Sequence, residues 1–497
     1  MPTVSLGMTA GAASSAAEAT GLALPAARPI ASRKPDAAAL RFRRYLIGFA
    51  LVGPPLLAYL VHRRPESLTL GQGLLAAAVV VTGFAPALAY LAGGARSPLP
   101  LLPLSGLFYA LTFGLPAFSE DLEWRMVPAE AITAAFVLTV CGVLVMYFAY
   151  LLSGRLLFRR LRPVRIPGRM TPARLRHVAW ASFAAHLAHQ FLPALQQAPS
   201  VGHFFHPLGW VAMGLLYLSH LQGTLPRLHA LVFFGLAMPV ALLGRLASGA
   251  LYEFFVVVVF LSLVYWQVRR RLPWAVLAAS AVFFVLLNDV KFEYRGRVSL
   301  AELEATDVWT KVTTLAEIVT ERYGDLQRAQ PADAAVSSVN RLGHIVMFAY
   351  VVETTPGMVP YWNGETYGFL LASALPRFLW PEKPVAGFGN EFGRRYLFLH
   401  PRNFDTTINV PWLIEFYMNF GAAGVIAGMA LVGVGFRFLI QKLSNPAGSP
   451  AEYVLGLSLV FQLFYAESNL ALMWGGLLLT FVSLYLTLRL ASMRLVE

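Results

Sequence analysis

Long apolar runs separated by short polar stretches dominate the pattern of hydrophobic and polar positions along this chain. Each run extends for about 20 residues, the length that an α-helix needs to cross a hydrocarbon core of about 30 Å. A β-barrel would instead show alternating positions over segments of about ten residues. The pattern predicts an all-α, polytopic membrane protein of about 12 transmembrane helices, at residues 44–62, 68–92, 99–117, 129–152, 176–196, 204–223, 227–246, 249–268, 273–290, 411–438, 452–467 and 470–489.

Composition supports this class. Of the 497 residues, 57% are hydrophobic and 13% are charged, which is about half the charged share of an average soluble protein. Residues 1–40 are rich in Ala, Gly, Ser and Pro and lack the continuous apolar core of a signal peptide, so we expect a disordered tail. The single cysteine, Cys141, excludes an intrachain disulfide and any zinc site that needs two thiolates.

The basic residues predict the orientation in the membrane. The tail ends in RFRR (41–44), residues 154–176 hold eight arginines and no acid, and residues 269–271 are RRR. All of these fall on one side if the N-terminus is cytoplasmic, as the positive-inside rule requires. With an even number of spans, both termini are then cytoplasmic and residues 291–410 lie outside. Because this placement explains the net charge of +13, we predict no nucleic-acid partner.

The long segment at residues 291–410 divides the chain. We predict a cytoplasmic tail (1–40), an N-terminal membrane domain of about nine helices (41–290), a large extracytoplasmic loop (291–410) and about three C-terminal membrane helices (411–497). The loop carries 13 of the chain's 26 acidic residues. Its part at 298–327 has an amphipathic helical pattern, whereas its second half is rich in Pro, Gly and aromatic residues, which favours irregular chain against the membrane face.

Candidate chemistry gathers in residues 340–424, where cations, acids and aromatic residues alternate. Arginine gives forked donors for phosphate oxygens, aromatic faces suit sugar rings, and an acid or a histidine can accept a proton from an attacking hydroxyl. A lipid-diphosphate-linked sugar at the outer membrane surface would need this combination. The alternative is an ordinary interfacial loop with an aromatic belt and compensating ion pairs.

This stretch resembles the O-antigen polymerase (oligosaccharide repeat-unit polymerase) family. The resemblance rests on Arg341, TTPGMVPYWNGETY (354–367), LPRFLWPEKP (375–384) and EFYMNFGAAG (415–424), with weaker similarity at 100–118 and 242–255. It implies a membrane glycosyltransferase in the bacterial inner membrane that polymerises polyprenyl-diphosphate-linked repeat units into O-antigen or exopolysaccharide. It also implies membrane lipids, a flippase and a chain-length regulator as partners. No nucleotide sugar and no cofactor are expected, because arginines can take the place of a metal at the diphosphate.

On this resemblance, cations of the loop and one cation of a membrane span would bind the diphosphate, and aromatic residues beside them would bind sugar. The candidates for diphosphate or sugar are Arg245, Arg341, Arg377, Lys383, Arg394, Arg395, Tyr361, Trp362 and Tyr367. Each cation has a simpler alternative: Arg341 as a snorkelling helix-end residue, Arg377 as an interface anchor, and Arg245 as a partner of Glu253.

The candidate general bases are Glu365 or His344, followed by Asp405 and Glu415. Glu365 lies in NGETY, a turn-like run that can hold a carboxylate rigidly, although a capping or surface acid is the alternative. His344 follows Arg341 by three residues and would share its helical face; an interfacial histidine is the alternative. The run from Asn419 to Gly424 is typical of close helix packing.

Other functions give different signals. Four histidines, at 186, 189, 203 and 206, include pairs at spacing i, i+3, but the glutamate of a metalloprotease motif is missing, so we predict no metal site. A ligase that transfers the finished glycan would need the same donor and clamp as a polymerase. A transporter or flippase would show paired repeats and mid-membrane charges. A cysteine-dependent enzyme would need Cys141 near the histidines and arginines.

Overall fold

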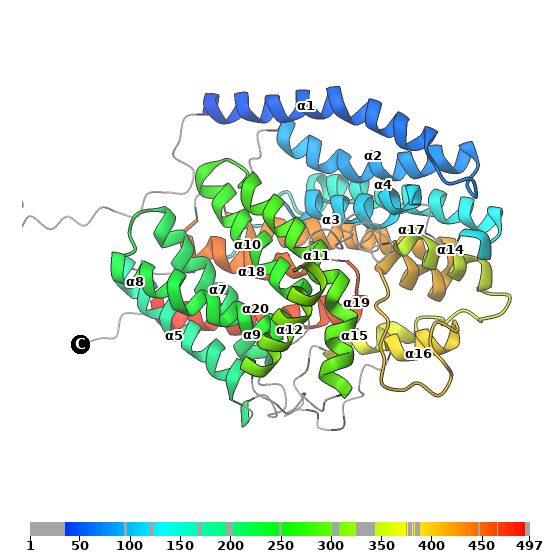
Figure 1. Cartoon of the computed structure of the whole chain (residues 1–497). Helices are drawn as coiled ribbons and strands as arrows, with labels where there is room; N and C mark the ends of the chain where they lie inside the picture. Colours follow the sequence, from blue (N-terminus) through cyan, green and yellow to red (C-terminus); the bar gives the residue numbers. More distant parts are fainter. Residues whose placement is uncertain are drawn as a thin grey trace, which may run out of the picture.

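The computed structural model describes residues 35–93, 97–119, 124–166, 171–192, 194–195, 202–247, 251–300, 308–324, 343–373, 375, 380, 382, 388–445, 448–464 and 466–492. Within these residues the regular structure is helical throughout (Figure 1). This confirms the all-α class. Each of the twelve apolar runs coincides with one helix or with two or three consecutive helical segments, as expected when hydrophobic length decides where helices form.

Seven helical segments among the described residues are long and apolar enough to cross a membrane. Four further apolar helices are shorter, so a count of about twelve spans stays a prediction. The seven are Phe42–His62, Leu70–Ala92, Leu101–Phe118, Ala129–Leu156, Arg227–Arg245, Trp412–Leu443 and Leu470–Ser492.

Helices α4 (Ala129–Leu156) and α17 (Trp412–Leu443) form the centre of one half of the bundle. Around this pair pack α2 (Leu70–Ala92), α3 (Leu101–Tyr109) and α14 (His344–Thr354), while α1 (Pro35–His62) lies along the edge over α2 (Figure 1). The first span is only 6% buried. Because the rest of the protein covers so little of α1, most of the apolar surface of this helix is open and suits contact with lipid.

The other half of the bundle surrounds α7 (Gly202–Leu221). It packs against α5 (Pro172–Phe191), α10 (Leu251–Arg269), α18 (Pro450–Phe464) and α20 (Leu477–Ser492). One continuous cluster of buried apolar side chains joins both halves. The two halves therefore share one main core, to which helices from α2 to α20 contribute, while Phe42 of α1 packs with Trp266 in a small separate cluster.

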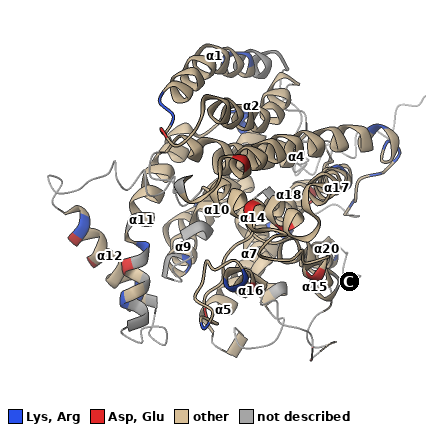
Figure 2. Cartoon of the chain, turned by 90° about the vertical axis from the view of Figure 1, so that its right-hand side faces the viewer, with Lys and Arg blue, Asp and Glu red and all other residues tan. Residues whose placement is uncertain are grey.

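The segment expected to be one large loop contains several helices. α11 (Trp274–Leu300) continues ten residues beyond the expected membrane boundary at residue 290. α12 (Val308–Tyr323) covers part of the predicted amphipathic stretch and packs on α11. The ion pair of Arg297 with Glu321 of α12 (2.6 Å) links these two helices, and Arg297 also pairs with Glu293 of its own helix (2.5 Å). Figure 2 shows charged positions on α12, in contrast to the long uncharged stretch of α4.

The second half of this segment is more regular than predicted. It contains α14, the short 3-10 helix η6 (Glu365–Tyr367), α15 (Gly368–Ser373) and α16 (Phe388–Arg395). At the N-terminus, helix α1 already begins at Pro35 and so includes the last six residues of the tail expected at 1–40; residues 1–34 lie outside the described residues. The remaining tail stays a prediction.

Close packing of α17 on α4 depends on Gly433. A Cβ atom added there would collide with the carbonyl oxygen of Met146. Small residues at such crossings let two membrane helices approach closely. We therefore expect Gly433→Ala to lower the free energy of unfolding by about 1–3 kcal/mol, because the helices must move apart. The apparent melting temperature of the purified protein in detergent measures this change.

The matched control is Gly48→Ala in α1, where a Cβ atom would meet nothing within 4 Å. This variant should melt at or slightly above the wild-type temperature, because alanine favours helix over glycine. Equal melting temperatures for Gly433→Ala and wild type would contradict the close crossing.

Candidate functional site

Helix α17 breaks inside its apolar run, at Phe420 and Gly421. Phe420 has φ −143° and ψ 19°, and Gly421 has φ 62° and ψ −150°. A Cβ atom on Gly421 would lie 2.8 Å from the phenol oxygen of Tyr361, so both backbone conformation and space require glycine. The expectation of plain close packing from Asn419 to Gly424 was therefore incomplete, because the helix is interrupted there.

Residues 361–367 pack against this break and form hydrogen bonds with Met418 and Asn419, the two residues before it. The amide of Trp362 donates to the carbonyl of Met418 (3.0 Å), and the amide of Gly364 donates to Oδ1 of Asn419 (2.8 Å). A break within an apolar span is tolerated where protein groups satisfy the freed backbone. The segment 361–367 and the broken helix thus stabilise each other.

Asn419 is the centre of this contact and is fully buried. Its Nδ2 donates to the hydroxyl of Thr366 (3.0 Å) and to the carbonyl of Glu415 (2.8 Å). Together with the bond from Gly364, one side chain joins both sides of the turn to α17. Removal of Asn419 would leave several buried polar groups without partners, which costs about 1–3 kcal/mol for each group.

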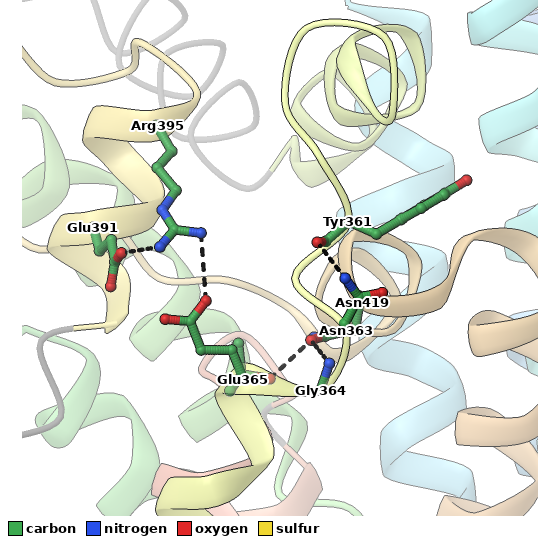
Figure 3. Close-up of polar contacts among 8 residues, drawn as sticks. Tyr361, Asn363, Gly364, Glu365, Glu391, Arg395 and Asn419 are labelled. Atoms are coloured by element: carbon green, nitrogen blue, oxygen red, sulfur yellow. Dashed lines mark hydrogen bonds and ion pairs between the residues drawn. The ribbon is translucent and has the colours of Figure 1, made fainter.

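A tight turn presents Glu365, as the NGETY composition predicted. Asn363 (φ 48°) and Gly364 (φ 88°) both adopt the left-handed conformation, which Asn and Gly accept most readily. The amide of Glu365 donates to the carbonyl of Trp362 (3.0 Å), and η6 then begins. Figure 3 shows that the Glu365 side chain leaves the turn on the side of Arg395, while Tyr361 points away from it.

Glu365 belongs to a cluster of two carboxylates around one guanidinium, which we call the Glu–Arg–Glu cluster (Glu365, Arg395 and Glu391). Nη1 of Arg395 lies 3.4 Å from Oε2 of Glu365, and Nη2 donates to Glu391 one helical turn earlier in α16 (Figure 3). The guanidinium carbon also lies 4.0 Å from the centre of the Trp362 ring. The cluster carries one net negative charge with both acids ionised, so Arg395 is already neutralised before any substrate phosphate arrives.

A buried polar contact fixes the C-terminal end of α16, at Tyr396. The hydroxyl of Tyr396 lies 2.7 Å from that of Thr355. Burial raises the pKa of Tyr396, so this phenol stays neutral. Arg394 does not face the cluster in the same way: its Nε donates to Oδ1 of Asn390 (2.9 Å), and its guanidinium stacks over Phe404 (4.5 Å). Arg394 and Arg395 therefore have separate environments.

The other predicted acids occupy different positions. Asp405 lies exposed in a surface turn, where its backbone amide donates to Oδ1 of Asn403 (3.1 Å). Glu415 is fully buried in α17, and its Oε2 accepts from the amide of Leu470 (2.6 Å) at the start of α19 (Leu470–Gly475). A carboxylate that accepts from the first amide of a helix stabilises that helix N-terminus.

The aromatic candidates are also separated by the structure. Trp362 is 5% exposed and lies beneath Arg395, so its face is covered. The ring of Tyr367 stacks on Phe420. Phe420 is 50% exposed and lies next to Gly364, because a Cβ atom there would be 3.2 Å from its Cζ. Phe420 was not among the sequence candidates, and it is the aromatic ring of this group that has a largely open surface.

His344 lies at the start of α14 and is buried against Phe108 and Phe113. Its Nε2 is 3.8 Å from Oε1 of Glu467, too long for a hydrogen bond. Burial lowers the pKa of His344 to about 4, so the imidazole is neutral at pH 7. This environment suits a packed histidine better than a base that must reach solvent-borne substrate.

Arg245 is separated from the Glu–Arg–Glu cluster. It lies on α9 (Met238–Ala247), which packs with α5, α10 and α12, and it is 3% exposed. Its guanidinium lies 5.0 Å from the Trp210 ring centre and 3.5 Å from Nε2 of His186. The side chain of the proposed partner Glu253 lies outside the described residues. Within the described part of the chain, no group of three or more histidines, cysteines or acids could hold a metal ion.

The remaining candidate cations are Arg341, Arg377 and Lys383, all of which lie outside the described residues. Three residues of this region were not chosen from the sequence: Glu391, Asn419 and Phe420. Glu391 could have been found by its i, i+4 spacing to Arg395, which is typical of a helical ion pair. Asn419 gave no comparable signal, because its partners Gly364 and Thr366 are more than 50 positions away in the sequence.

Comparison with protein families places the chain in one family. The model for a domain of unknown function, DUF8712, matches residues 141–496, well over half of the chain, so the chain belongs to this family. A search of curated proteins and a search of solved structures each gave no match.

Asn419→Ala tests the contact between the turn and the broken helix. We expect it to lower the free energy of unfolding by about 2–4 kcal/mol, since the buried partners of the amide lose their hydrogen bonds. Asn363→Gly is the control, because Asn363 is exposed and glycine keeps the left-handed conformation. Thermal unfolding in detergent should separate the two variants; equal melting temperatures would contradict the central role of Asn419.

The lowered pKa of His344 predicts a pH-dependent stability. Between pH 6.5 and 4 the unfolded chain binds a proton at this histidine and the folded protein does not, so stability falls as the pH falls through this range. The groups facing the imidazole are Glu467, Phe108 and Phe113. We expect His344→Asn to reduce the loss of melting temperature between pH 7 and 4.5.

His400→Asn serves as the control for this measurement, because His400 is exposed. It should show the wild-type pH dependence. A His344→Asn profile parallel to that of wild type would mean that His344 protonates in the folded protein without cost.

Proposed function

We propose that this member of the family is a membrane glycosyltransferase that polymerises polyprenyl-diphosphate-linked oligosaccharide repeat units at the outer face of the bacterial inner membrane. One observation carries the proposal. A rigid turn with an exposed carboxylate is fixed to a broken, membrane-length helix by hydrogen bonds from Trp362 and Gly364. Such a position suits a substrate with a lipid tail and a water-soluble glycan. The resemblance of residues 340–424 to O-antigen polymerases supports the same reaction.

The reaction joins one glycan to the next without a nucleotide. A hydroxyl oxygen of the acceptor sugar attacks the anomeric carbon of the donor glycan, and a new C–O bond forms. The bond between that carbon and the diphosphate oxygen breaks, and the lipid diphosphate leaves with the electron pair. Glu365 is the proposed base that accepts the hydroxyl proton. It is half-exposed, unlike the buried alternatives Glu415 and His344.

The leaving diphosphate gains negative charge, so cations near it should contribute most to catalysis. Arg341, Arg377, Lys383 and Arg394 remain the proposed cations for this role. Arg395 is less suitable, because Glu365 and Glu391 already flank it. Arg245 is also less suitable, since it is buried among α5, α7 and α9.

The proposed orientation in the membrane follows from the distribution of basic residues along the sequence. Both termini would be cytoplasmic and the segment 291–410 periplasmic, with a flippase supplying lipid-linked units and a chain-length regulator as a further partner. A ligase would use the same donor and the same leaving group, and would differ in its acceptor. The experiment below separates these two activities by the product that accumulates.

A deletion strain complemented with wild type or Glu365→Gln tests the proposal. We expect the deletion to leave single lipid-linked repeat units, and Glu365→Gln to reduce long glycan by at least about 100-fold at normal protein abundance, as loss of a general base does. Glu353→Gln, at an exposed position of α14, should restore the wild-type ladder.

Gel analysis of the glycan together with the lipid-linked intermediates gives the readout. Long glycan that persists on its lipid in the deletion strain would identify a ligase. Single units confined to the cytoplasmic face would identify a flippase. A normal ladder from Glu365→Gln would exclude Glu365 as the base.

A further inference from the structure

We propose that the Glu–Arg–Glu cluster is a sugar-binding subsite that accepts a neutral or amino sugar and rejects a uronic acid. This inference rests on the proposed function, since a polymerase must hold an acceptor glycan beside its base. It assigns Arg395 to the sugar in place of the diphosphate. Both carboxylates and the guanidinium are accessible, with side chains that are 50% (Glu365), 37% (Glu391) and 39% (Arg395) exposed.

Charge decides which ligand fits. Two carboxylates flank one guanidinium, so an incoming anion meets one net negative charge at short range. A uronate or a phosphate bound to the remaining N–H donors of Arg395 would lie close to both glutamates and be repelled by them. A neutral sugar meets no such penalty, and an amino sugar gains attraction. The cluster therefore disfavours anions, although it contains an arginine.

The donors and acceptors match sugar hydroxyls. Each ionised carboxylate offers two acceptor oxygens, and a guanidinium has five N–H donors. The two ion pairs use one nitrogen each, Nη1 toward Glu365 and Nη2 toward Glu391. Neighbouring hydroxyls of a pyranose can therefore donate to a glutamate and accept from Arg395 at once. Charge-assisted bonds of this kind are stronger than those between neutral groups.

An independent observation, the open aromatic face of Phe420, points to the same ligand class. Its ring is 50% exposed, is backed by Tyr367, and lies against Gly364, the residue before Glu365. Sugar rings have apolar C–H faces that pack on aromatic rings, while their hydroxyls bind polar groups at the ring edge. The broken helix thus places an aromatic ring against Gly364, in the turn that presents Glu365.

The rigidity of the cluster is also informative. Trp362 supports Arg395 from below at 4.0 Å, Asn419 holds the turn, and the buried Tyr396 follows Arg395 in the chain. Exposed ion pairs usually contribute only about 0–1 kcal/mol to stability. So small a contribution to stability does not explain why the cluster is supported on several sides. A rigid support does lower the entropy cost of binding a ligand.

The experiment measures binding of simple glycosides to the full-length protein in detergent, by saturation-transfer difference NMR at pH 7. The probes are the methyl glycosides of glucose, glucosamine and glucuronic acid. We expect clear transfer to the first two and at least fivefold less to the glucuronide. Glu391→Gln should raise the glucuronide signal relative to the glucoside about fivefold, because it removes the net negative charge.

Two further variants make the result specific. Phe420→Ala should weaken transfer to all three probes, while Phe404→Ala, at an exposed aromatic residue that contacts Arg394, should leave it unchanged. Far-ultraviolet circular dichroism and melting temperatures confirm that each variant is folded. Equal transfer to glucoside and glucuronide in wild type, transfer to no probe, or no effect of Glu391→Gln on selectivity would overturn the subsite.

This result can be distinguished from the test of polymerisation. The predicted selectivity together with a normal ladder in the deletion strain would retain the sugar subsite and reject the polymerase. A lost ladder together with an absence of selectivity would retain the polymerase and reject the subsite.

Discussion

The arrangement of the candidate site depends on one contact: the amide of Asn419 with the turn that precedes Glu365. Helix α17 cannot continue through Phe420 and Gly421, so polar backbone groups near the break need partners within the protein. Trp362 supplies one by donating to the carbonyl of Met418, and the side chain of Asn419 bonds to Gly364 and Thr366. In return, the turn is fixed in space, and so is the backbone of Glu365. A defect in the helix and a loop outside it therefore form one unit.

This contact explains why a carboxylate can be exposed and yet rigid. Arg395 arrives from α16, is supported by Trp362, and lies between Glu365 and Glu391. The buried groups His344, Glu415 and Arg245 have enclosed surroundings. The exposed Glu–Arg–Glu cluster is thus separate from these buried polar residues. Its turn is attached to α17, the membrane-length helix that carries the break. This position is the reason for proposing a lipid-linked glycan as the substrate.

Sequence patterns predicted the parts of this architecture that depend on local physics. Apolar length placed the helical segments, and Asn363 with Gly364 predicted the turn at Glu365, which the left-handed backbone confirms. The break in α17 could not be predicted in this way, because the residues from Asn419 to Gly424 equally suit close packing of an unbroken helix. Its partners are distant in sequence. The second acid beside Arg395, Glu365, is 30 positions away, so the sequence could not show that this arginine lies between two carboxylates.

The most direct test of the account is the sidedness and accessibility of Glu365. Cys141 is the single cysteine, so Cys141→Ser provides a background in which Glu365→Cys can be labelled alone. A membrane-impermeant maleimide added to intact spheroplasts should modify Glu365→Cys at once, and should modify Arg160→Cys, in the arginine-rich segment, only after the membrane is opened. Labelling of Arg160→Cys from outside, with Glu365→Cys protected until permeabilisation, would contradict an outward-facing site on the broken helix.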